Sequence, residues 1–137
     1  MHAFNAYGML CIELFVTKDQ HVLVNELAPR PHNSGHYTIE GCVTSQYENH
    51  IRAILGLPLG STELIRPTVM KNIIGNVNKK AEVHGLEEAY KYPEVKIHIY
   101  GKEECRVGRK MGHITVTDKT IEDALFKARY AHSKIKF

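Results

Sequence analysis

The sequence predicts an α+β fold in two parts, and three patterns along its 137 residues indicate this. Two apolar segments, 9–16 and 21–27, flank a short polar stretch, which is typical of an antiparallel hairpin. Apolar residues then recur at helical spacing over 38–55. The rest of the chain alternates short strand-like segments and closes with a capped helix. We therefore expect residues 1–60 to form a hairpin packed on a helix, and residues 61–137 to form a small β-rich part with a terminal helix.

Composition narrows the class of protein. Apolar residues make up 43% of the chain, enough for a core, and the formal net charge of +3 is too small to indicate a nucleic-acid partner. The three cysteines form no C-x-x-C pair, and their odd number argues against a disulfide framework. No apolar run approaches the roughly 20 residues of a membrane span, and no signal-peptide pattern is present. We expect a cytoplasmic protein that binds neither nucleic acid nor membrane.

The elements of the first part are bounded by turn and helix-stop residues. The polar stretch 17–20 separates the two strands, and Pro29 and Pro31 end the second one. Gly56 stands where a helix C-cap glycine belongs, and Pro58 prevents continuation. These residues favour one helix over 38–55.

The second part is predicted from alternating segments and one capping box. Strands are expected at 68–74, 95–100 and 113–117, and a short helical turn at 86–90. Thr120 and Asp123 have the spacing of a capping box at the start of the last helix. The apolar face of that helix is expected to contain Ile121, Ala124, Leu125, Ala128 and Ile135.

Two glutamates in the hairpin form the first candidate site. Glu13 lies in an apolar strand, where a charge is costly. If Val16 faces His21, Glu13 faces Val24, and Glu26 becomes its diagonal neighbour on the same face. Two carboxylates in one space repel unless a cation or a shared proton lies between them, and Mg²⁺ suits such a pair. The alternative is that both glutamates face solvent, and an odd-numbered loop breaks the shared-face argument.

The stretch "NELAPRPHNSGH", residues 25–36, places several hydrogen-bond donors directly after the second glutamate. His32 and His36 have a spacing that suits zinc on a helix, but Pro31 and Gly35 disfavour a helix there, and no further ligand completes a zinc site. A loop of donors beside a carboxylate pair favours an anion held next to a metal. The alternative is a polar loop that only caps the following helix.

The sequence resembles a known enzyme family over most of its length. "CIELFVTKDQHVLVNELAPRPHNSGHYTIEGCVTSQYENHIRAILGLPLGST" and "YGKEECRVGRKMGHITV" are similar to the carboxy-terminal part of 5-(carboxyamino)imidazole ribonucleotide synthases. These ATP-grasp ligases of purine biosynthesis are also described as the ATPase subunit of phosphoribosylaminoimidazole carboxylase. The resemblance implies the carboxy-terminal part of an ATP-grasp fold followed by the small β-rich part.

The resemblance also implies a reaction and a metal site. ATP and bicarbonate carboxylate the amine of aminoimidazole ribonucleotide, with carboxyphosphate as the intermediate. Glu13 and Glu26 are expected to hold the Mg²⁺ that bridges the ATP phosphates, and Asn25 and Glu26 to contact the nucleotide. Ala28 stands where many ATP-grasp enzymes place an asparagine, so a third protein ligand is not expected there.

Two further groups of residues are assigned by the resemblance. The candidate catalytic residues, expected to line the bicarbonate and ribonucleotide site, are Arg30, His32 and Asn33. The candidate contacts of the ribonucleotide 5′-phosphate are Lys102, Arg109 and Lys110. A solvated basic loop is the alternative for the second group.

The resemblance implies that this chain is part of a longer enzyme. ATP-grasp enzymes also use a lid subdomain and, in this family, an amino-terminal domain, so we expect little activity from the chain alone and a possible homodimer. One alternative is another ATP-grasp purine enzyme, such as the formate-dependent glycinamide ribonucleotide transformylase. The second alternative is a non-catalytic interaction module derived from the family.

Overall fold

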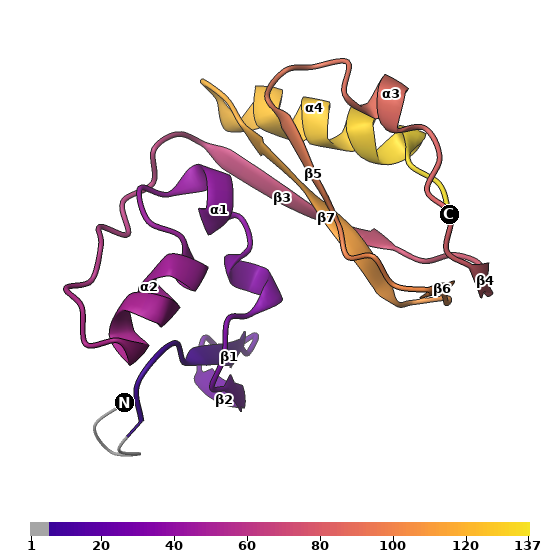
Figure 1. The fold of residues 1–137 in the computed structure, drawn as a ribbon. Helices are drawn as coiled ribbons and strands as arrows, with labels where there is room; N and C mark the ends of the chain where they lie inside the picture. The colour runs from indigo at the N-terminus through magenta and orange to yellow at the C-terminus, as the bar shows by residue number, and fades with distance from the viewer. Residues whose placement is uncertain (1–5) are drawn as a thin grey trace. The chain divides into compact units, whose positions relative to one another are not determined.

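The computed structural model describes residues 6–137, which form two compact units (Figure 1). The first unit ends at residue 63, and the second spans 64–137. Residues 1–5 of the predicted first part lie outside the described residues.

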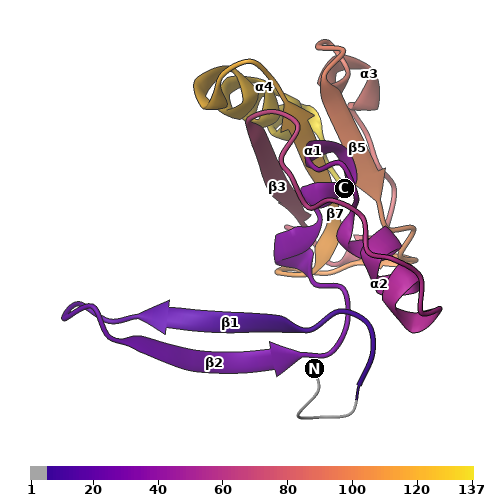
Figure 2. The ribbon, with the colours of Figure 1, turned by 90° about the vertical axis from the view of Figure 1, so that its left-hand side faces the viewer.

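The first unit opens with an antiparallel hairpin, as predicted. Strands β1 (Cys11–Val16) and β2 (Val22–Ala28) lie side by side as a two-stranded ribbon (Figure 2). Gln20 adopts a left-handed conformation with φ of 63°, as expected at the end of a three-residue hairpin loop. Apolar side chains of both strands are exposed on both faces: Ile12, Leu14, Phe15, Val16, Val22, Leu23, Val24 and Leu27. Among residues 6–137, the hairpin therefore forms no core of its own.

The prediction of one helix over 38–55 is wrong. A 3₁₀ turn, η2 (Asn33–Gly35), is followed by two separate helices, α1 (Thr38–Gly41) and α2 (Gln46–Ile54). The chain leaves the helical conformation after α1 and starts again at Ser45, whose hydroxyl accepts a hydrogen bond from the backbone N–H of Glu48. A serine N-cap of this kind stabilises a new helix start, which the apolar spacing alone does not reveal.

The end of α2 is the predicted one. Gly56 has a φ of 68°, and the backbone N–H of Leu57 donates to the carbonyl of Arg52 at 2.8 Å. This is the pattern of a glycine-terminated helix.

The second unit is built on a three-stranded antiparallel sheet in the order β3-β7-β5 (Figure 1). The strands are β3 (Thr68–Ile74), β5 (Val95–Ile99) and β7 (Lys110–Thr117). All three predicted strands are confirmed, although β7 begins earlier than expected, at Lys110. The predicted helical turn is α3 (Leu86–Ala89), and a small two-stranded sheet pairs β4 (Lys79–Lys80) with β6 (Glu104–Cys105).

The terminal helix α4 (Ile121–Lys134) packs on this sheet. Thr120 caps it as predicted, because its hydroxyl accepts a hydrogen bond from the N–H of Asp123. The predicted apolar face is only partly correct, because Ile121 and Leu125 are exposed. The fully buried positions are alanines: Ala124, Ala128 and Ala131. Small side chains allow the helix to lie close to a core that contains Val95, Cys105, Met111, Ile114 and Val116.

Among residues 6–137, no helix has both the length and the apolar character that crossing a bilayer requires.

Candidate metal and nucleotide site

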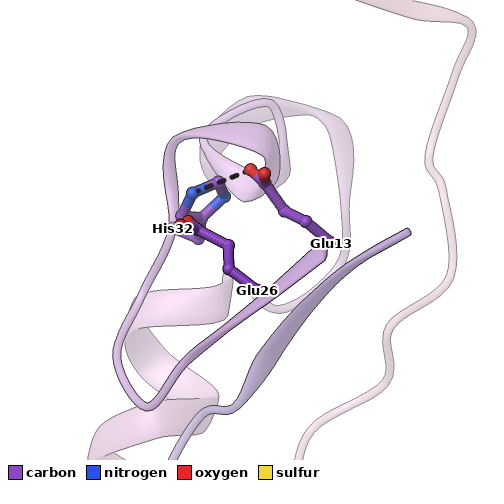
Figure 3. A group of neighbouring side chains, drawn as sticks. All are labelled: Glu13, Glu26 and His32. Carbon is purple, nitrogen blue, oxygen red and sulfur yellow. Dashed lines mark ion pairs between the residues drawn. The ribbon is translucent and has the colours of Figure 1, made fainter. Parts of the chain in front are cut away.

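Glu13 and Glu26 face each other across the hairpin (Figure 3). From the turn as far as Leu14 and Val24 the strands pair in one register. A β-bulge then shifts the register, with Asn25 as the extra residue, and Glu13 pairs directly with Glu26. Bulges of this kind re-aim side chains and are frequent beside active sites.

The predicted register is wrong, but the predicted shared face is confirmed. Val16 pairs with Val22 and not with His21, so the loop has an odd number of residues. In that register without a bulge, Glu13 pairs with Asn25, and Glu26 points to the opposite face. The bulge brings the second glutamate back to the face of the first.

Two hydrogen-bond donors hold the carboxylate of Glu13. The side-chain amide of Asn25 donates to Oε2 at 3.2 Å, and Nε2 of His32 lies 3.2 Å from Oε1. His32 is largely buried, with 12% of its side chain exposed, whereas Glu13 is 39% exposed. The carboxylate of Glu13 therefore has a hydrogen-bond donor beside each of its oxygens.

The three side chains of Figure 3 fit a divalent cation. One ligand atom each from Glu13, Glu26 and His32 lies within 4.8 Å of the other two. Mg²⁺ prefers carboxylate oxygens and keeps positions open for phosphate oxygens. The carboxylate pair suits such an ion because a cation relieves the repulsion between the two charges.

Arg30 and Asn33 lie on either side of His32 in the predicted loop. The guanidinium of Arg30 is exposed and donates to the carbonyl of Pro31 at 3.1 Å. Asn33 opens the 3₁₀ turn η2. The side chain of Ala28 is buried and supplies no ligand atom.

Gln46 supports the loop and was not identified from the sequence. Its Oε1 accepts a hydrogen bond from the backbone N–H of His32 at 3.0 Å, and its Nε2 donates to the backbone carbonyl of His32 at 2.8 Å. Gln46 is 8% exposed. A Cβ on Gly35 would lie 2.5 Å from Oε1 of Gln46, so only glycine leaves room for this amide. The apolar spacing of the helix gives no signal for an inward-facing glutamine.

The predicted basic residues lie in the second unit. Lys102 and Arg109 line one surface depression of about 420 Å³, together with Arg106, Glu103 and Glu104. The ammonium of Lys102 donates to the backbone carbonyl of Lys110 at 2.7 Å, and Arg109 donates to the carbonyl of Glu104 at 3.1 Å. The side chain of Lys110 does not line this depression.

Arg106 was not singled out from the sequence. Its guanidinium pairs with the carboxylate of Glu104 at 2.6 Å. Hydrogen bonding and charge from Arg106 hold the pKa of Glu104 below its usual range. The depression therefore carries both signs of charge, and Arg109 and Lys102 are its remaining cations.

Segments of both units match known protein families. Residues 1–47 match the ATP-grasp domain family, and residues 68–127 match the family described as phosphoribosylaminoimidazole carboxylase C-terminal domain. The N5-carboxyaminoimidazole ribonucleotide synthase of Bacillus subtilis is 55% identical over 111 residues, which are 81% of this chain and 28% of that protein. The crystal structure of the Thermotoga maritima synthetase superposes with a TM-score of 0.86 at 55% identity, covering 98% of this chain and 38% of that one.

The chain belongs to the N5-carboxyaminoimidazole ribonucleotide synthase family.

It spans about 28% of the length of the Bacillus subtilis family member. A further family member, from Aspergillus clavatus, was solved in complex with ADP and 5-aminoimidazole ribonucleotide. That structure has a TM-score of 0.77 at 41% identity and covers 92% of this chain and 34% of that one. The glutamate pair and the loop 25–36 lie in the segment that matches the ATP-grasp domain family. The depression with Lys102 and Arg109 lies in the segment that matches the C-terminal domain of the synthase family.

Proposed function

We propose that this chain is part of an ATP-dependent ligase that carboxylates 5-aminoimidazole ribonucleotide with bicarbonate, giving N5-carboxyaminoimidazole ribonucleotide in purine biosynthesis. The observation that carries the proposal is the opposed pair Glu13 and Glu26, within a segment that matches the ATP-grasp domain. The names of the family members and the nucleotide and ribonucleotide complex of one of them support the substrates.

The proposed reaction has two steps. An oxygen of bicarbonate attacks the γ-phosphorus of ATP, ADP leaves, and carboxyphosphate forms. The amine of the ribonucleotide then attacks the carboxyl carbon, and phosphate leaves as the proton of the amine is lost. Phosphoryl transfer depends mainly on positioning and on stabilising charge.

Glu13 and Glu26 are the proposed ligands of Mg²⁺, which supplies positive charge to the phosphates when it is bound. Glu13 is suited to this role because Asn25 and His32 already fix the orientation of its carboxylate. Asn25 and Glu26 are the proposed contacts of the nucleotide.

The roles of the other predicted residues are also proposals. Arg30, His32 and Asn33 are assigned to the bicarbonate and ribonucleotide site, where an arginine fork stabilises anionic oxygens. The 5′-phosphate is assigned to Lys102, Arg109 and Lys110. The shared depression supports the first two of these, whereas the position of the Lys110 side chain gives it less support.

The activity is proposed for a larger assembly than this chain. The exposed apolar side chains on both faces of the hairpin favour its completion by polypeptide outside this chain, which spans about 28% of the Bacillus subtilis family member. We assign this role to the amino-terminal part of the enzyme. A cytoplasmic location and a homodimer are further parts of the proposal.

Mixing the chain with the separately purified amino-terminal part of a family member tests this function. The measurement is ADP formation that requires both bicarbonate and the ribonucleotide. We expect turnover from the mixture and little from either part alone. Full turnover by the 137-residue chain alone, or none from a mixture shown to form a complex, contradicts the proposal.

A further inference from the structure

We propose that His32 serves the glutamate pair as a fixed hydrogen-bond donor to Glu13 and not as a metal ligand, and that Ser34 and Gln46 are positioning residues that hold it in this role. The inference rests on the proposed function only for the identity of the cation. The hydrogen bonds themselves are properties of the first unit.

Ser34 determines which ring nitrogen of His32 carries the proton. The backbone N–H of Ser34 points at Nδ1 of His32 at 3.4 Å, and the Ser34 hydroxyl lies 2.9 Å from the same atom. A backbone N–H can only donate, so Nδ1 is an acceptor. A neutral imidazole has one donor and one acceptor nitrogen, which leaves the proton on Nε2.

The protonated nitrogen faces the glutamate. Nε2 of His32 lies 3.2 Å from Oε1 of Glu13. A nitrogen that carries a proton has no lone pair to offer a metal ion. His32 lies close enough to Glu13 and Glu26 to share a cation with them. With its proton on Nε2, however, it acts on a cation only through Glu13, by a hydrogen bond that orients the carboxylate.

Gln46 holds the backbone of His32 from the other side. Its amide bonds both the N–H and the carbonyl of His32, at 3.0 and 2.8 Å. Because Gln46 is nearly buried and Gly35 leaves room for it, this amide has little freedom to move. Helix α2 thus holds the backbone of His32, and this backbone positions the Nε2–H donor that faces Glu13.

These contacts give Glu13 a carboxylate of fixed orientation before a cation arrives. Asn25 donates to one oxygen and His32 to the other. Partners of this kind orient metal ligands, and their loss commonly lowers metal affinity or activity by about 10–100-fold.

The protonated nitrogen is directly observable. Long-range ¹H–¹⁵N NMR of the histidine-labelled chain distinguishes Nε2–H from Nδ1–H imidazole, and nuclear Overhauser contacts report whether the His32 ring lies against Glu13. We expect the Nε2–H form, retained when Mg²⁺ is added. An Nδ1–H ring in the free chain, or conversion to that form on addition of Mg²⁺, overturns the proposal. In that form Nε2 carries no proton, so it cannot donate to Glu13 and has a lone pair that can bind the metal ion.

Variants test the two positioning residues. Ser34→Ala removes the hydroxyl that contacts Nδ1 and keeps the backbone N–H, so it should increase the Nδ1–H fraction of His32 only in part. Ser34→Thr, which keeps the hydroxyl, should restore the parent spectrum. Gln46→Glu, which replaces the donor to the His32 carbonyl by an acceptor, should remove the contacts between the His32 ring and Glu13 and weaken Mn²⁺ binding about 10–100-fold. Tyr47→Phe is the matched control, because the Tyr47 hydroxyl contacts His36 and not His32.

Unchanged His32 spectra and unchanged Mn²⁺ affinity in both Ser34→Ala and Gln46→Glu refute the positioning roles. The measurement on the parent chain stands by itself if a Gln46 variant does not fold. None of these experiments uses nucleotide, bicarbonate or ribonucleotide, so their outcome is independent of the carboxylation assay.

Discussion

Nε2 of His32 lies 3.2 Å from Oε1 of Glu13, so the loop that follows the hairpin and the first strand of the hairpin meet at one carboxylate. The bulge at Asn25 brings Glu26 to the same place. Residues that are separated along the sequence thereby form one acidic site with its own hydrogen-bond donors.

Glu26→Gln should lower kcat of the recombined enzyme by about 10²–10³-fold, because it removes one anionic ligand while keeping size and hydrogen bonding. The KM for the ribonucleotide should change much less. Steady-state kinetics with varied ATP and varied ribonucleotide measures both. Glu82→Gln, which changes an exposed glutamate of the second unit, is the control. A kcat within threefold of the parent removes Glu26 from the metal site.

Arg109→Ala should raise the KM for the ribonucleotide with a smaller effect on kcat and on ATP. Its proposed contact is a phosphate that does not react, so the variant loses binding energy shared by the ground and transition states. Arg129→Ala, on the exposed side of α4, is the matched control. An unchanged ribonucleotide KM in Arg109→Ala shows that the depression does not hold the 5′-phosphate.

The second unit should become less stable as the pH falls below about 6.5, the ordinary pKa of histidine. Burial, followed by the nearby charge of Lys71, lowers the pKa of His132. His132 therefore binds a proton more readily in the unfolded chain than in the folded one. Neutral His132 favours the folded state fully above the ordinary pKa, and this contribution is lost as the pH falls from there toward the lowered pKa of the folded state. Urea unfolding at several pH values measures this dependence.

His132→Gln should flatten that dependence, whereas His21→Gln, which changes an exposed histidine of the hairpin, should not. Equal slopes in the parent and in His132→Gln assign the pH dependence to other groups.

Lys127→Met should lower the free energy of unfolding at neutral pH. The ammonium of Lys127 lies 2.9 Å from Glu94 and 2.7 Å from Asp118, and both carboxylates lose their cation in the variant. Hydrogen bonding to Lys127 holds the pKa values of Glu94 and Asp118 below their usual range. Their stabilising contribution is present above about pH 4 and is lost as the pH falls through the lowered values.

The deficit of Lys127→Met relative to the parent should therefore shrink in acid, as unfolding measurements at neutral and acidic pH will show. Lys96→Met, at an exposed position of β5, should show no such deficit. A deficit that is constant down to the acid limit points to lost packing of the lysine stem and not to the ion pairs.

Local patterns predicted most of the elements. The hairpin, the strands of the second unit and the Thr120 cap follow from period-two alternation and helix-start residues, which act within a few positions of the chain. The break between α1 and α2 was missed because apolar spacing continues across it, while the Ser45 cap that restarts the helix is a single residue.

The sequence predicted that the two glutamates share a face, but it did not predict the register that brings them together. The shared face of Glu13 and Glu26 is correct, but it depends on a bulge at Asn25 that compensates for an odd-numbered loop. Neither feature has a spacing signature in this sequence. The role of Gln46 was also missed, because it depends on a contact between a helix and a loop that precedes it. The contacts of Arg30 and Asn33 with substrates stay predictions.

Glu13 and Glu26 are proposed to hold the divalent cation together, and paramagnetic broadening by Mn²⁺ is the sharpest test of this metal site. In the ¹⁵N-labelled chain, low concentrations of Mn²⁺ should broaden amide signals around Glu13 and Glu26 first, and excess Mg²⁺ should reverse the effect. Glu13→Gln and Glu26→Gln should each abolish it. Broadening centred elsewhere in the chain, or unchanged at the hairpin in both variants, contradicts a metal site formed by the two glutamates.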